Sequence, residues 1–406
     1  MSKGSVKLIM VTADNNNKFY NMKDNGDDSF TVTWGRVGAT STDTVYPIKK
    51  WDSIYRNKTK KGYKDITEIF AEEVSDDVDF ADINDLQIKR LVNALQSYAN
   101  HSVQQNYLVT SESVTQKQVD EAQSLVDQLA VVKSDTDSGE ANELLLEIYS
   151  IIPRRMSNVK YYIFGERSRI GQYSRDSLNR LITNEQATLD VMRGQVSTNA
   201  KTKDVDHKEE KNILDAMGLT IVPIDDNDHA TILKLLGPNA GQFKSAVKVV
   251  NLTTQELYDN HIKKVENPQG YLFWHGSRNE NWWSILDTGL VLRPSNAVVT
   301  GKMFGYGLYF ADKAQKSIGY TSLRGSYWAR GGGDKAYLAL FAVHTGNWLH
   351  SQRHESWMYD LNEQKLRSRG NYDSLFAEGG IDLRNNEYIV YNQAQCTVQY
   401  LVEIGS

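Results

Sequence analysis

Two aromatic-rich tracts contain the residues whose types and spacing suit ligand-binding chemistry. One reads Phe-Trp-His-Gly-Ser at residues 273–277, and the other reads Gly-Tyr-Gly-Leu-Tyr-Phe at residues 305–310. Aromatic faces can hold a flat ring by stacking, while small residues let backbone N–H and C=O groups reach the substituents of that ring. Together the tracts predict a pocket for a planar heterocycle, whereas each tract alone is also typical of an ordinary hydrophobic core.

Several common kinds of site are excluded by their missing motifs. The chain has no Walker loop, no His-Glu-x-x-His and no Gly-x-Ser-x-Gly elbow, and Gly305 and Gly307 lack the third glycine of a dinucleotide fingerprint. A doubly wound NAD-binding domain is therefore not expected. The single cysteine, Cys396, excludes disulfide frameworks and Cys-rich zinc sites and predicts a reducing, intracellular compartment. No apolar run reaches the ~20 residues that span a bilayer, so no membrane partner is expected.

A basic segment stands out in an acidic chain. The 406 residues carry a formal charge of -5, yet eight basic residues oppose two aspartates in residues 29–64 and give that segment a charge of +6. Such a local patch suits nucleic-acid phosphates, and an exposed Trp34 beside it would stack on a base or sugar. The alternative interpretation is a solvated charged face with Trp34 buried in a strand.

The elements that must position these residues divide the chain into three parts. Alternating apolar residues predict strands over residues 6–11, 19–22 and 30–34, and so a small antiparallel-sheet domain over residues 1–75. Amphipathic periodicity, with a Thr115-x-x-Gln118 capping signal, predicts an α-helical bundle over residues 83–205. Residues 195–211 are polar and are predicted to form a linker. Short apolar runs broken by Gly, Asn and Asp predict an antiparallel, β-rich domain over residues 211–406, which makes the fold class α+β and multidomain.

Four tracts in order carry a resemblance to a known family. They are residues 273–277, residues 300–312 (Thr-Gly-Lys-Met-Phe-Gly-Tyr-Gly-Leu-Tyr-Phe-Ala-Asp), residues 316–322 (Lys-Ser-Ile-Gly-Tyr-Thr-Ser) and residues 386–392 (Asn-Glu-Tyr-Ile-Val-Tyr-Asn). In order and spacing they resemble the catalytic domain of poly(ADP-ribose) polymerases. The Trp34-Gly35-Arg36 tract resembles the WGR domain of the DNA-dependent members, and the helical segment resembles their regulatory helical subdomain.

The resemblance implies an NAD-dependent ADP-ribosyltransferase that needs no metal, and it assigns roles to the matching positions. Glu387 would be the catalytic carboxylate that stabilises the oxocarbenium-like charge on the nicotinamide ribose. His275 would bind the adenosine ribose, Gly276 would hold the carboxamide with help from Ser317, and Tyr309 and Tyr320 would sandwich the nicotinamide ring. Two weaker candidates for NAD binding are Lys316 and Ser277, and Met303 would line the acceptor side.

The same resemblance implies a DNA-break sensor with an internal restraint. Trp34 and Arg36 would contact a 5'-phosphorylated DNA end or the neighbouring helical domain, and Lys49 and Lys50 would add phosphate contacts that are independent of sequence. The helical domain would obstruct NAD until DNA binding loosens it. The acceptors would be the protein itself and nearby proteins.

Three departures from the family pattern limit what carries over. One cysteine excludes the N-terminal zinc fingers of the longest members. Family members have arginine directly after a Gly-Leu pair, whereas here Val291 follows Gly289-Leu290, and Arg293, two residues later, would have to substitute in the adenine-side contact. The chain also ends at Ser406 without the short hydrophobic tail by which some relatives engage a histone cofactor, so serine-directed modification with such a partner is not expected.

Other activities remain as alternatives. A mono(ADP-ribosyl)transferase of the same fold is possible because residues 346–386, which border the acceptor side, differ from those of the animal members. A DNA-end-binding scaffold with weak catalysis is the third interpretation. The expected location is the nucleus in a eukaryote and otherwise the cytoplasm or nucleoid.

Overall fold

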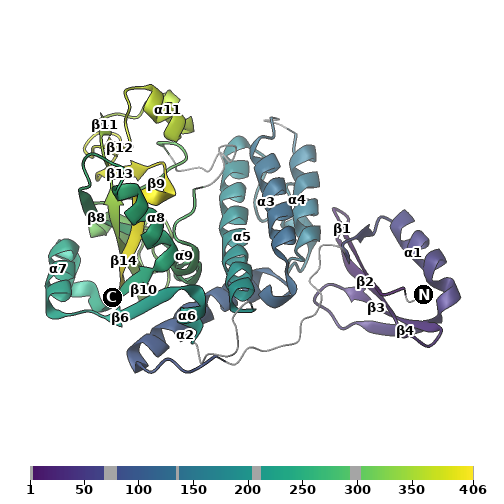
Figure 1. Cartoon of the computed structure of the whole chain (residues 1–406). Coiled ribbons are helices and arrows are strands. Elements are labelled where there is room, and N and C mark those ends of the chain that lie inside the picture. The colour runs from purple at the N-terminus through teal and green to yellow at the C-terminus, as the bar shows by residue number, and fades with distance from the viewer. Residues whose placement is uncertain (1–2, 68–79, 134–136, 204–211, 293–302, 406) are drawn as a thin grey trace. The chain divides into compact units, whose positions relative to one another are not determined.

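The computed structural model describes residues 3–67, 80–133, 137–203, 212–292 and 303–405. The described chain forms two compact units (Figure 1). One contains the N-terminal sheet and residues 102–196, and the other contains residues 80–101 and the described residues from 197 onwards. The predicted domain limits at residues 75, 205 and 211 lie outside the described residues. None of the described helices combines the length and the hydropathy needed to cross a membrane.

The N-terminal sheet is antiparallel throughout, as the sequence predicted, with the strand order β4-β3-β2-β1-β5. Its core includes Phe30 and Val32 from β3, and the Trp51 ring of α1 packs edge-on against Phe30 with the ring centroids 5.0 Å apart. Period-two alternation places Trp34 on the same face of β3 as Phe30 and Val32, but the Trp34 side chain stays 43% exposed. The elements are β1 (Ser5–Thr12), β2 (Asn16–Asp24), β3 (Ser29–Arg36), β4 (Thr42–Pro47), α1 (Trp51–Lys60) and β5 (Lys64–Asp65).

The start of α3 and the end of α4 lie where the sequence predicted them. Thr115 and Gln118 form a reciprocal capping box at the start of α3, and α4 ends before Pro153, which cannot continue a helix. The Gln123 and Gln186 side chains join α3 to α5 through amide hydrogen bonds of 2.8 Å. The helices are α2 (Leu86–Asn106), α3 (Gln116–Ala130), α4 (Gly139–Ile151) and α5 (Arg175–Lys203).

The prediction of a polar linker beginning at residue 195 was wrong. Helix α5 continues to Lys203, because the segment keeps apolar and uncharged residues at buried positions, among them Val196 and Thr198. The Thr198 hydroxyl donates to the Asp287 carboxylate at 3.1 Å, so this polar side chain is satisfied without leaving the helix.

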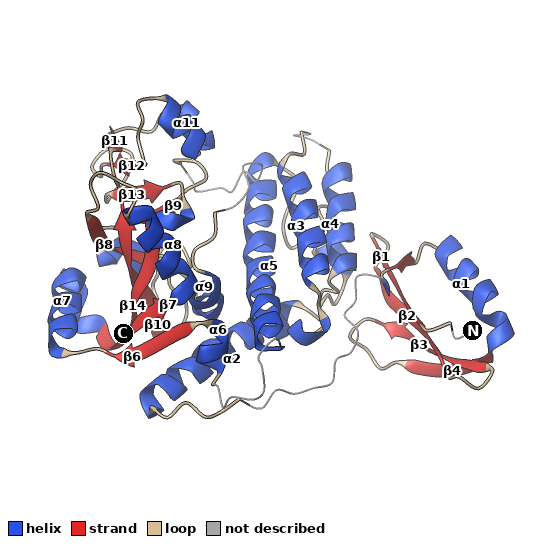
Figure 2. Ribbon diagram, in the orientation of Figure 1, coloured by secondary structure: helices blue, strands red, loops and turns tan. Residues whose placement is uncertain are grey.

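The C-terminal region contains two sheets, shown in red in Figure 2. The larger has the order β6-β7-β14-β10-β8 and is antiparallel throughout, and the smaller has the order β11-β12-β13-β9. The parallel pairing of β11 with β12 departs from the antiparallel prediction, whereas the remaining pairs of the smaller sheet are antiparallel. The strands are β6 (Leu219–Pro223), β7 (Phe243–Asn251), β8 (Gly270–Gly276), β9 (Leu308–Phe310), β10 (Lys335–His344), β11 (Trp348–Ser351), β12 (Ser374–Ala377), β13 (Glu387–Val390) and β14 (Cys396–Gly405).

A backbone bridge connects the two sheets, and helices flank their strands. Trp274 in β8 exchanges two backbone hydrogen bonds, of 2.8 and 2.9 Å, with Ala311, the residue after β9. This bridge joins the end of the larger sheet to the smaller one and so brings the two aromatic-rich tracts together. The helices are α6 (Ile213–Met217), α7 (Asp226–Leu236), α8 (Leu252–Ile262), α9 (Trp282–Thr288), α10 (Ala314–Ile318) and α11 (Glu363–Ser368).

Candidate active site and basic surface

The end of β8 places His275 and Gly276 beside the second aromatic tract. The His275 Nδ1 atom lies 3.0 Å from the backbone oxygen of Tyr309 in β9, next to the bridge between the two sheets. A Cβ atom on Gly276 would lie 1.9 Å from the backbone oxygen of Ser317 in α10. Only glycine allows this approach, which brings the predicted carboxamide-binding residues Gly276 and Ser317 side by side.

The two predicted stacking tyrosines lie close to Glu387. The Tyr309 hydroxyl donates to the Gly305 oxygen at 2.9 Å and accepts from the Phe304 N–H at 3.1 Å, which fixes the ring. Burial, followed by the nearby Glu387 carboxylate, raises the pKa of Tyr309 well above its usual value and raises the pKa of Tyr320 to about 12. Both phenols are therefore neutral at physiological pH and offer aromatic faces close to one carboxylate.

Glu387, the first residue of β13, forms an ion pair with Lys316 of α10. The side chains are 10% and 12% exposed, and the Lys316 ammonium also lies 3.5 Å from the backbone oxygen of Asn385. A buried carboxylate requires such a partner, because an unpaired charge is costly in a low-dielectric environment. The arrangement can stabilise positive charge that develops on a substrate between the tyrosines.

Asn386, the residue before Glu387, contacts Asp312, and sequence analysis assigned neither of them to the site. The Asn386 Nδ2 atom donates to the Asp312 carboxylate at 2.8 Å, and the Asn386 Oδ1 atom accepts from the Gly379 N–H at 2.9 Å. Asn386 lies in the tract over residues 386–392, directly before Glu387. Asp312 ends the tract over residues 300–312, two residues after Phe310. Their position was therefore visible in the sequence, whereas their mutual contact was not.

The structure describes two of the three remaining predicted site residues, Ser277 and Met303. Arg293 lies outside the described residues. The Ser277 hydroxyl accepts a hydrogen bond from the Asn281 amide at 2.9 Å, and Met303 packs at the edge of the apolar cluster that contains Phe304.

The predicted DNA-binding residues fall into two groups. Lys49 and Lys50 are exposed in the turn that precedes α1, and Trp34 is also exposed. Arg36, in contrast, donates to the backbone and side-chain oxygens of Asn15 at 2.9 and 2.8 Å and to the backbone oxygen of Ser157 at 3.3 Å. Its guanidinium is thus engaged with the loop before residue 159, on the helical side of this unit.

Two known domain families match parts of this chain. Residues 227–405 match the poly(ADP-ribose) polymerase catalytic domain, and residues 6–69 match the WGR domain. Poly [ADP-ribose] polymerase 2 of Zea mays is 25% identical over 97% of this chain and 68% of its own length.

Two proteins of Invertebrate iridescent virus 6 are also similar. Uncharacterized protein 101L is 37% identical over 48% of this chain and 78% of its own length. Putative poly [ADP-ribose] polymerase-like 100L is 32% identical over 37% of this chain and 79% of its own length. With its WGR domain, its catalytic domain and these relatives, the chain belongs to the poly(ADP-ribose) polymerase family, whose members are NAD-dependent ADP-ribosyltransferases.

Proposed function

We propose that this enzyme builds ADP-ribose chains on itself and on nearby proteins when its WGR domain engages a 5'-phosphorylated DNA break. The observation that carries the proposal is the placement of Glu387 beside Tyr309, Tyr320 and Lys316. A carboxylate in that position serves a reaction in which positive charge appears on the ribose.

The chemistry follows from these contacts. The bond between the ribose C1' atom and the nicotinamide nitrogen breaks, and its electron pair leaves with neutral nicotinamide. The ring of the leaving group is held between the two tyrosines, where the pyridinium charge of NAD favours stacking before the bond breaks. Glu387 binds the ribose 2-hydroxyl and orients the acceptor hydroxyl, whose oxygen forms the new bond to C1' as its proton is released.

The DNA part of the proposal rests on the exposed side chains of the N-terminal sheet domain. Lys49 and Lys50 lie on the surface of a segment of charge +6, in the same domain as the exposed Trp34 ring. Ammonium groups pair with phosphates irrespective of base sequence, and an exposed indole stacks on a terminal base or sugar.

A single experiment tests the catalytic part. The wild type and a Glu387→Gln variant are incubated with labelled NAD, with and without a nicked duplex that carries a 5'-phosphate, and the products are separated on a denaturing gel. We expect a DNA-dependent, high-molecular-weight smear from the wild type, and a loss of about 100-fold or more in nicotinamide release for the variant. Glu256→Gln, a change at an exposed carboxylate on α8, is the matched control.

The outcomes separate the alternatives. A single sharp band would indicate mono-transfer, and no nicotinamide release under either condition would leave only the DNA-end-binding scaffold.

The DNA part is tested with the double variant Lys49→Gln/Lys50→Gln. If each lysine neutralises one phosphate, the slope of log affinity against log salt becomes shallower by about 1.8. The adjacent exposed lysines Lys263 and Lys264, changed in the same way, provide the matched control. An unchanged affinity and salt slope would reject these lysines as phosphate contacts.

A further inference from the structure

The loop that follows Tyr320 has a shape fixed by its own hydrogen bonds. The backbone oxygen of Gly319 accepts from the N–H groups of Trp328 and Ala329 at 2.9 and 3.0 Å. The Gly331 N–H donates to the Ser326 hydroxyl at 2.7 Å, and the Arg278 guanidinium donates to the Ala329 oxygen at 2.9 Å. These bonds tie the loop to the turn that carries Tyr320 and to the segment that follows β8.

This loop presents an exposed indole to the Tyr320 ring. Trp328 is 61% exposed, yet its ring lies nearly parallel to that of Tyr320, with an interplanar angle of 18° and 6.0 Å between the centroids. Gly319 makes room for the indole, because a Cβ atom there would lie 3.2 Å from the Trp328 Cδ1 atom. An exposed indole that the backbone holds against one aromatic ring indicates a role at that ring, since solvent exposure of a large apolar side chain brings no stability.

The two stacking tyrosines differ in what holds their rings. The Tyr309 hydroxyl has two hydrogen bonds to the backbone of residues 304 and 305. Among the described residues the Tyr320 hydroxyl has no hydrogen-bond partner, its side chain is 40% exposed, and its ring pairs with Trp328. Among the described residues, the Tyr320 ring therefore lacks the polar anchors of Tyr309 and has the Trp328 indole as its aromatic neighbour.

We propose that Trp328 is a positioning residue that holds the Tyr320 ring at the angle at which it stacks on the nicotinamide ring of NAD. The proposal rests on the proposed function, because it takes Tyr320 as one wall of the nicotinamide site. Trp328 acts in substrate binding and leaves the glycosidic bond cleavage to Glu387. Since the ring contact is present in the bound ground state and in the transition state alike, its loss raises KM without lowering kcat.

The test compares Trp328→Ala with Trp328→Phe and Tyr359→Ala in the full-length chain. We expect Trp328→Ala to raise the KM for NAD about three- to ten-fold, as the loss of one aromatic pair implies, with kcat unchanged. The inhibition constant of nicotinamide should rise by the same factor, because the product occupies the same ring site. Trp328→Phe should restore most of the affinity. Tyr359, which is 58% exposed and packs against His354 instead of Trp328, is the aromatic control and should leave both constants unchanged.

Two results would overturn the proposal. One is an unchanged KM and nicotinamide inhibition constant in Trp328→Ala, while Glu387→Gln abolishes turnover. The other is a joint fall of kcat and melting temperature in both Trp328 variants, which would assign the indole to folding alone. Either result leaves the proposed function standing, whereas a wild type that releases no nicotinamide would reject that function instead.

Discussion

Asn386 holds the start of β13, and with it Glu387, through two hydrogen bonds. Asn386→Ala removes the bonds to Asp312 and Gly379. The loss leaves the Asp312 carboxylate without its amide donor, while its other oxygen is already buried without a partner among the described residues. Because a carboxylate displaced by a fraction of an ångström stabilises the transition state less well, we expect kcat to fall about ten- to 100-fold with little change in KM. Steady-state kinetics of nicotinamide release measures both constants.

A second asparagine in the same domain serves as the control for Asn386. Asn362 caps α11 by accepting from the Lys365 N–H at 2.9 Å and, among the described residues, makes no hydrogen bond to β13. Asn362→Ala should reduce stability by about 1 kcal/mol, as the loss of a helix cap does, and leave kcat unchanged. Equal losses of kcat in the two variants would show that Asn386 supports the domain rather than the position of Glu387.

At this scale the sequence predicted the residues and missed their partners. Tyr309, Tyr320 and Glu387 stand in tracts whose order and spacing carry the resemblance, so each could be named before any contact was known. Trp328 and Asp312 could not, because their roles depend on which loop folds against which strand. Arg36 shows the same limit. The resemblance implied a contact with a DNA end or with the helical domain, but not the hydrogen bonds to Asn15 in the turn between β1 and β2.

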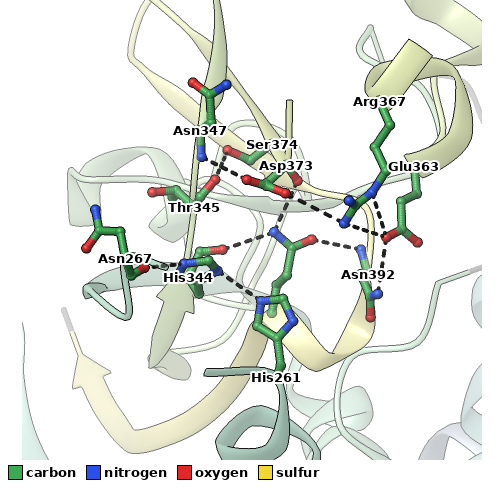
Figure 3. Close-up of polar contacts among 11 residues, drawn as sticks. His261, Asn267, His344, Thr345, Asn347, Glu363, Arg367, Asp373, Ser374 and Asn392 are labelled. Atoms are coloured by element: carbon green, nitrogen blue, oxygen red, sulfur yellow. Dashed lines mark hydrogen bonds and ion pairs between the residues drawn. The ribbon is translucent and has the colours of Figure 1, made fainter. Parts of the chain in front are cut away.

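At the scale of elements, a pair of histidines joins α8 to the end of β10. The His344 Nε2 atom lies 2.9 Å from the Asn267 backbone oxygen, which can only accept, so this nitrogen carries the proton. The Nδ1 atom of a neutral His344 must then accept from the His261 Nε2 atom, 2.9 Å away. Figure 3 shows the pair near Asp373, Arg367 and Glu363. The Gln395 side-chain amide donates to the backbone oxygens of His344 and Asp373, each at 3.1 Å.

This pair predicts a loss of stability in mild acid. Burial lowers the pKa of His261, as do His344 and Arg367, whereas the Asp373 and Glu363 carboxylates act in the opposite direction. An unfolded histidine takes up a proton near pH 6.5, and folded His261 takes it up at a lower pH. The unfolded state therefore binds more protons in this window, and the free energy of unfolding falls as the pH drops below about 6.5.

The comparison of His261→Gln with the wild type measures this contribution. The glutamine amide can still donate to the His344 Nδ1 atom but cannot titrate. The denaturation midpoint of the variant should therefore fall less than that of the wild type between pH 7.5 and pH 5.5. His101→Gln, at an exposed position, should follow the wild type. Parallel curves for His261→Gln and the wild type would exclude His261 as the source of the pH dependence.

Elements with local signals were predicted well, and those set by tertiary pairing were not. The capping box at Thr115 and the stop before Pro153 are local, and the structure confirms both. The short strands β11 and β12 have no strong alternation of their own and form because they pair with each other and with β13. The end of α5 was missed for a related reason, since burial of Val196 and Thr198 outweighs the polar composition of residues 197–203.

At the scale of the whole molecule, a buried ion pair in the helical region links its stability to the proposed control of the active site. Arg154 and Glu185 are 9% and 10% exposed at their side chains, and the guanidinium carbon of Arg154 lies 4.7 Å from the Tyr107 ring centroid. The Arg154 Nη1 atom has no hydrogen-bond partner among the described residues. Breaking such a pair leaves an uncompensated charge in the interior, at a cost of about 3–5 kcal/mol.

Glu185→Gln should therefore weaken the dependence of the enzyme on DNA. If the helical region restrains NAD binding until DNA engages, a destabilised region visits its open state more often, and nicotinamide release without DNA should rise several-fold while the DNA-stimulated rate changes little. Asp120→Asn, which removes only the exposed ion pair with Arg193 at 3.4 Å, should leave both rates unchanged. Hydrogen exchange of α4 and α5 reports directly whether the region has loosened. Exchange could become faster in Glu185→Gln while nicotinamide release stays as dependent on DNA as in the wild type. That result would show that loosening the helical region does not open the active site, and it would reject the proposal that this region restrains NAD binding.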